Sequence, residues 1–186
     1  MDAIMLALVA VALANADGRA GLFLSHLLTV RPGRRVTLVI VFGAFLIHAL
    51  VAAFAGALAN RMIGQGVAQL LVAAAMLSAA VALLWRAAPL ADAGAEQASP
   101  VMLAGRMLAL QFGDRSHFLI GALAATSGAG LWAAAGGMIG WVLAMLPFLA
   151  FGAAIAGRRG ARFVRWGSAA VLALWGVRTA MGAFGL

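Results

Sequence analysis

The sequence contains no cysteine and no lysine, and only five of its 186 residues are acidic. The absence of cysteine excludes disulfides, thiolate metal sites and thiol redox chemistry, and three histidines alone argue against a zinc site. Charged residues make up 10% of the chain, whereas a soluble domain carries about 25%. No nucleophile–base–acid set and no phosphate-binding loop is visible, so we expect no enzymatic activity and no cofactor.

Long apolar runs take the place of the missing charge. Hydrophobic residues make up 66% of the chain, and the mean hydropathy is +1.08. A helix needs about 20 apolar residues to cross a bilayer, and lipid forces backbone groups to pair within a segment. The sequence therefore predicts an all-α integral membrane protein in contact with the lipid bilayer. Six transmembrane helices are expected, over residues 3–29, 36–60, 65–86, 100–126, 130–156 and 163–184.

The arginines predict how these spans are oriented. The net charge of +8 comes from 13 arginines, and most of them lie between apolar runs, which favours the positive-inside rule over nucleic-acid binding. We expect a multi-pass protein of the inner membrane, with both termini periplasmic and the central linker cytoplasmic. Nine arginines fall at the links predicted to be cytoplasmic and two at the opposite side. The nine are Arg31, Arg34, Arg35, Arg86, Arg106, Arg158, Arg159, Arg162 and Arg165, and the two are Arg61 and Arg178.

The chain contains a weak internal repeat. An offset of 96 aligns Asn15 with Gln111 and Arg19 with Arg115, and an offset of 97 aligns "ALANR" (57–61) with "AIAGR" (154–158). Three spans per half force the second half to enter the membrane in the opposite sense. We therefore predict two inverted three-helix repeats, 1–87 and 100–186, joined by a linker over 88–99, an architecture typical of secondary transporters.

Four charged residues are predicted at mid-membrane depth, where each one costs at least about 2.5–3.5 kcal/mol unless it is paired or hydrated. They are Asp17 and Arg19 in the first span and Asp114 and Arg115 in the fourth. One interpretation is a substrate or ion site lined by both halves. The other is structural, with Arg115 paired to Asp17 and Arg19 paired to Asp114.

Glycines beside these residues predict local unwinding of both spans, at Gly18 and Gly113. Helical spacing predicts that Gln111, Asp114, Arg115 and Phe118 lie on one face of the fourth span, at i, i+3, i+4 and i+7.

Several other polar residues are weaker candidates. His48 lies in mid-span and is a candidate proton relay, with an interhelical hydrogen bond as the alternative. His26 and His117 are predicted to lie near the membrane interfaces. Ser116 is a candidate ligand, although such residues more often join helices.

The second half resembles a known family. "Gln111-Phe112-Gly113-Asp114-Arg115-Ser116" matches four of the five specified positions of the motif E-x-G-D-[KR]-[ST], which marks the transmembrane protein 165 family. The first-half segment, residues 15–20, matches that motif only at Arg19. The resemblance implies a six-helix exchanger of Mn²⁺ or Ca²⁺ for protons.

By this resemblance, Asp17 and Asp114 are the expected metal ligands. Asn15, Gln111 and Ser116 complete the expected ion-binding set, and Arg19 and Arg115 balance its charge. Asn15 and Gln111 supply amide oxygens where the family has glutamates, which weakens a divalent-cation site.

Three functions follow as hypotheses. The leading one is a secondary transporter of a divalent metal cation by exchange with protons. The alternatives are a non-transporting membrane scaffold or accessory protein with a decayed site, and a transporter of a different small ion such as an organic anion. A homodimer is compatible with each of these hypotheses.

Overall fold

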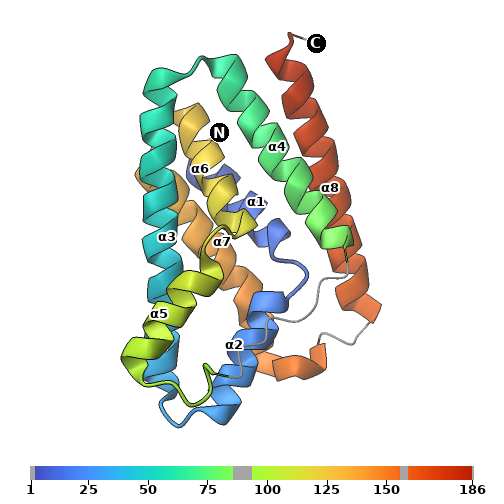
Figure 1. The fold of residues 1–186 in the computed structure, drawn as a ribbon. Coiled ribbons are helices and arrows are strands. Elements are labelled where there is room, and N and C mark those ends of the chain that lie inside the picture. The colour runs from blue at the N-terminus through green and yellow to red at the C-terminus, as the bar shows by residue number, and fades with distance from the viewer. Residues whose placement is uncertain (1–2, 86–93, 156–158, 186) are drawn as a thin grey trace.

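The structure, a computed structural model, describes residues 3–85, 94–155 and 159–185. Within these ranges the chain is helical, as expected (Figure 1). Arg86, Asp92, Arg158 and residues 88–93 of the predicted linker lie outside the described residues. The helices are α1 (Ala3–Ala14), α2 (Arg19–Val30), α3 (Arg34–Met62), α4 (Gln65–Leu84), α5 (Pro100–Gln111), α6 (Arg115–Ser127), α7 (Gly130–Phe151), the 3-10 helix η1 (Gly152–Ile155) and α8 (Arg159–Ala183).

Two of the six predicted spans are broken into shorter helices. Span 3–29 consists of α1 and α2, which are bent by 73° relative to each other, and span 100–126 consists of α5 and α6. Each of these four helices has 12 or 13 residues. At 1.5 Å per residue they are roughly 18–20 Å long, too short to cross a hydrocarbon core of about 30 Å. Both breaks fall at the glycines that predicted unwinding.

Three helices, α3, α4 and α7, are each long and apolar enough to cross a membrane, and the bent pair of α1 and α2 makes a fourth candidate span. The predicted spans 100–126 and 163–184 are not among these candidates. The first contains a polar break between α5 and α6. The second corresponds to α8, which contains four arginines, Arg159, Arg162, Arg165 and Arg178, and is less apolar than the other long helices.

Large apolar side chains cover the outside of the protein. Phe54, Leu131 and Leu174 are each more than 70% exposed, whereas alanine supplies more than half of the buried apolar residues. Small residues inside and large apolar residues outside suit a bilayer, which solvates the outer surface and favours close helix packing.

Close helix packing depends on glycines at two crossings. A methyl group at Gly140 of α7 would overlap the carbonyl oxygen of Leu8 in α1, and one at Gly56 of α3 would overlap the carbonyl oxygen of Gly121 in α6. These contacts hold α1 against α7 and α6 against α3, so one long helix of each half supports a short helix of the other half.

The breaks divide the bundle into two ends. Figure 1 shows α1 and α6 toward the end at which α3 joins α4, and α2 and α5 toward the opposite end. The order of elements repeats, with a broken helix followed by two long helices in each half. The long helices α3 and α7 run in opposite directions (Figure 1).

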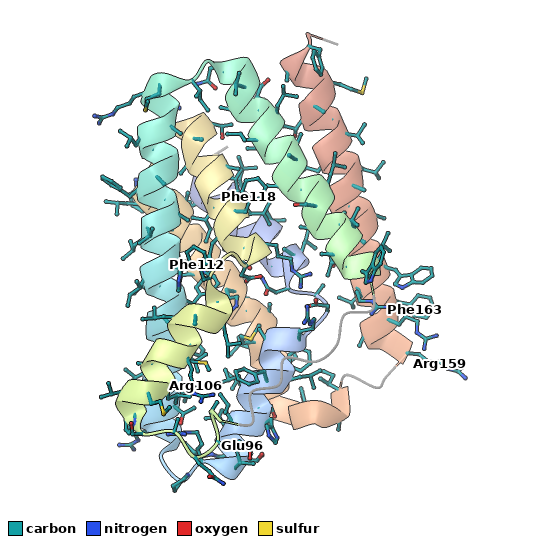
Figure 2. All side chains as sticks on the ribbon, viewed as in Figure 1. Glu96, Arg106, Phe112, Phe118, Arg159 and Phe163 are labelled. Atoms are coloured by element: carbon teal, nitrogen blue, oxygen red, sulfur yellow. The ribbon has the colours of Figure 1, made fainter. Side chains whose placement is uncertain are left out.

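The described part of the linker is bound to the end of α2. The guanidinium of Arg31 donates to the carbonyl oxygens of Ala95, Glu96 and Ala98, at 2.6–3.1 Å. His26 Nε2 lies 2.9 Å from Glu96 Oε1 on the surface. Figure 2 shows Glu96 and Arg106 at this same end of the bundle. The predicted position of His26 near a span end agrees with this placement.

Candidate functional site

The first break is a turn between α1 and α2. The amide of Gly18 donates to the carbonyl oxygen of Asn15 at 3.1 Å, and Gly18 has a φ of 70°, in the left-handed region that favours glycine. Asp17 Oδ1 accepts from the backbone N–H of Arg19 at 3.3 Å, at the start of α2. The turn therefore fixes a carboxylate beside the positive end of a short helix.

The second break has a similar local geometry. Helix α5 ends at Gln111, Gly113 has a φ of 73°, and Asp114 precedes the first residue of α6. The expectation that Gln111, Asp114, Arg115 and Phe118 share one face of a continuous helix is therefore wrong. The turn changes the chain direction between Gln111 and Asp114, so helical spacing does not apply across it.

Polar contacts join the breaks. Arg115 Nη2 forms an ion pair with Asp17 Oδ2, and Asn15 Nδ2 donates to Ser116 Oγ at 2.9 Å. The side chains of Arg115 and Asp17 are 15% and 8% exposed. Each contact links the first half to the second, so the breaks form one site, and the predicted pair of Arg115 with Asp17 is present. The pair of Arg19 with Asp114 stays a prediction.

A cavity of about 370 Å³ lies on the α2 and α5 side of this junction. Its volume holds roughly a dozen waters at about 30 Å³ each. Six of the predicted site residues line the cavity, whereas Ser116 is fully buried behind it. These six are Asn15, Asp17, Arg19, Gln111, Asp114 and Arg115.

The rest of the wall is apolar and rich in aromatic residues. Phe23, Phe45, Phe112 and Trp141 all line the cavity. Phe45 and Trp141 stack with their ring centroids 4.3 Å apart. The cavity therefore combines a small polar region with apolar walls, which is the usual composition of a small-molecule site.

Gln111 and Arg115 each have a buried polar atom at this site without a hydrogen-bond partner among the described residues. Gln111 Nε2 donates to the carbonyl oxygen of Val41 at 3.2 Å, whereas Gln111 Oε1 is buried and unpaired. The second atom is Arg115 Nε, beside the Nη2 that contacts Asp17. Buried polar atoms normally have partners, so Gln111 Oε1 and Arg115 Nε are candidate partners for a solute that enters the site.

The site is formally neutral. Asp17 and Asp114 are balanced by Arg19 and Arg115, with one charge of each sign from each half. The negative ends of α1 and α5 and the positive ends of α2 and α6 also meet here. Across the described ranges, no three His, Asp or Glu side chains are grouped so that they could hold a metal ion.

A second cavity, of about 440 Å³, lies between α3 and α6 and reaches Asp114 from the other side. It contains His48 and His117, whose ring centroids are 5.2 Å apart. His48 Nδ1 lies 3.0 Å from the carbonyl oxygen of Ala44, so the predicted relay residue has a partner within its own helix and does not line the first cavity.

The expected position of His117 near a membrane interface disagrees with its contacts, because its ring lies beside that of His48 in the middle of α3. His117 is only 6% exposed, and its ring packs 4.7 Å from that of Phe45. Neither ring nitrogen has a hydrogen-bond partner in the described part of the chain. The apolar run that follows His117 could have indicated burial, because it continues α6 for two further turns.

Comparisons with protein-family models, with curated proteins and with solved structures found no match to this chain.

The left-handed glycines at the two breaks, Gly18 and Gly113, differ in their surroundings. Alanine at either position is strained by about 1 kcal/mol. A methyl group at Gly113 meets no atom within 4 Å, whereas one at Gly18 overlaps the ring of Phe148. That ring also lies against Gly21, so it has little room to move.

We therefore expect Gly113→Ala to lower the free energy of unfolding by about 1 kcal/mol and Gly18→Ala to lower it by clearly more. Thermal and denaturant unfolding in detergent would measure both variants. Equal losses would contradict the packing of Phe148 against the first break.

Proposed function

We propose that this protein is a secondary transporter built from two inverted three-span repeats, 1–87 and 100–186. One observation carries the proposal: a broken helix from each half contributes charged and amide side chains to a single cavity. Helices broken at mid-membrane expose side chains and backbone to a solute, and two such elements related by a repeat can alternate around a shared site. No catalytic step is part of the proposal.

The arginine distribution supports an orientation. Arg31, Arg34 and Arg35 lie where α2 joins α3, and Figure 2 shows Arg106 and Arg159 toward the same end. By the positive-inside rule this end is cytoplasmic, and both termini are then periplasmic in an inner membrane. The cavity lies on the α2 and α5 side of the junction, so this form of the transporter is proposed to face the cytoplasm.

The cargo implied by the family resemblance is Mn²⁺ or Ca²⁺, exchanged for protons. Asp17 and Asp114 would supply carboxylate oxygens, and Asn15 and Gln111 would supply amide oxygens, the ligand types that these cations prefer. Arg115 contacts Asp17, so a divalent cation that binds Asp17 must displace this guanidinium.

Flux in proteoliposomes tests the transport proposal. The purified protein should support saturable movement of a solute, with Mn²⁺ and Ca²⁺ each tested together with an internal pH dye. Asp114→Asn should abolish the flux because it removes one of the two carboxylates. Glu96→Gln is the matched control, since it removes a carboxylate outside the cavity and should leave the flux intact. Equal flux through the wild type and Asp114→Asn would show that the site assignment is wrong.

The ion pair of Asp17 and Arg115 favours a second candidate, a non-transporting scaffold. A crossed pair between halves can hold helices together without any solute. A scaffold should copurify with a stoichiometric partner and should show no solute-dependent thermal shift. A transporter should show a saturable thermal shift without a partner.

A further inference from the structure

The ion pair at the junction constrains what the first cavity can bind. A cation that takes Asp17 leaves the Arg115 guanidinium buried without its partner. An anion that binds Arg115 leaves the Asp17 carboxylate buried without its partner. A buried charge without a partner is strongly unfavourable. Arginine cannot avoid this cost by becoming neutral, because its guanidinium does not lose its proton in proteins. A solute that bears both charges avoids either penalty.

The unpaired atoms point to the same class of solute. Gln111 Oε1 accepts hydrogen bonds and Arg115 Nε donates them, and both are buried without partners among the described residues. An ammonium group could donate to Gln111 Oε1 and to Asp17. A carboxylate could accept from Arg115 Nε and Nη2, in the two-pronged geometry that arginine favours.

The walls of the cavity suit an apolar substituent. Phe45 and Trp141 form a stacked aromatic surface, and Met107 and Leu110 of α5 add aliphatic surface. The volume of about 370 Å³ lies within the range of roughly 300–1,000 Å³ for small-molecule sites, and a bare metal ion would leave most of this apolar wall without a partner.

We propose that the first cavity binds a small zwitterion, with an ammonium group, a carboxylate and an apolar side chain, which inserts between Asp17 and Arg115 and replaces their ion pair by two new ones. Gln111 orients the ammonium group, and the aromatic wall selects the side chain. This inference rests on the proposed function for the transport of the solute, whereas binding can be measured without transport.

Binding to the purified full-length protein in detergent tests the inference, with thermal shift and calorimetry as readouts. The probes are leucine and phenylalanine, together with two relatives of leucine that each lack one charge, 3-methylbutylamine and 4-methylpentanoate. MnCl₂ and CaCl₂ form the metal arm, at matched ionic strength. We expect saturable binding of at least one zwitterion, with each one-charge relative and each metal binding about tenfold more weakly or worse.

Three variants distinguish a loss of binding at the site from a loss of folding. The double variant Asp17→Asn/Arg115→Gln removes the pair without leaving either charge alone, so it should fold and lose zwitterion binding. Glu96→Gln, at the surface, should bind as the wild type does. Gln111→Leu should weaken binding by about tenfold, the equivalent of about 1.4 kcal/mol.

Equal or tighter binding of a one-charge relative or of a metal would overturn the inference, as would the absence of binding by both zwitterions. Metal flux in proteoliposomes without zwitterion binding would leave the transport proposal standing and remove this one. Zwitterion binding without flux of any tested solute would leave this inference standing and remove the transport proposal.

Discussion

Replacing Asp17 by asparagine is expected to lower the free energy of unfolding by about 3–5 kcal/mol, because it leaves the Arg115 guanidinium buried without its counter-charge. Arg115→Gln should lower the free energy of unfolding by a similar amount, because it leaves the Asp17 carboxylate buried without its counter-charge. Both side chains are less than one-fifth exposed, so solvent screens the pair only weakly. This loss is the largest that we expect from any single substitution at the site.

The double variant Asp17→Asn/Arg115→Gln should recover most of this loss, because neither charge is then left alone. Reversible unfolding of the four proteins in one detergent gives the coupling energy directly. The exposed pair of His26 and Glu96 provides the control, since Glu96→Gln should cost no more than about 1 kcal/mol. Additive losses in the double variant would show that Asp17 and Arg115 do not interact in solution.

A cysteine introduced into the cavity is expected to react with a membrane-impermeant maleimide from one face of the membrane and not from the other. The chain has no cysteine of its own, so each variant reports a single site. Ala20→Cys and Leu110→Cys line the cavity and should react from the face on which α2 joins α3. Ser116→Cys, fully buried behind the junction, should react from neither face.

Two glycine positions calibrate this labelling. Gly33 lies between α2 and α3, and Gly64 lies between α3 and α4, at opposite ends of the bundle (Figure 1). Both have negative φ values, and an added side chain has space at each. Gly33→Cys and Gly64→Cys should therefore fold normally and react from opposite faces. Labelling of Ala20→Cys from the Gly64 face alone would contradict the position of the cavity.

The helical class and both breaks could be predicted from the sequence because they depend on local chemistry. Apolar runs dictate helices in lipid, and Gly18 and Gly113 adopt the left-handed conformation that their residue type allows. The ion pair of Arg115 with Asp17 was one of two interpretations, because charges at equal predicted depth tend to be paired.

The lateral arrangement of the helices could not be predicted from the sequence. The contact of Asn15 with Ser116, the bond from Gln111 to Val41 and the burial of His117 all depend on which helices are neighbours. Neighbours are selected by close approaches such as those at Gly56 and Gly140, and a weak repeat does not specify them. For the same reason, the apolar wall formed by Phe45 and Trp141 was not expected.

We propose that one site, formed by both breaks, is exposed to each face of the membrane in turn. The most direct measurement is the labelling rate of Ala20→Cys from each face, without solute and with a saturating solute that stabilises the protein. Alternating access predicts that Ala20→Cys reacts from the Gly33 face in the free protein, and that the solute slows this reaction and opens one from the Gly64 face. Reaction from both faces at once, or from the Gly33 face at an unchanged rate, would show that the site does not alternate between the two faces.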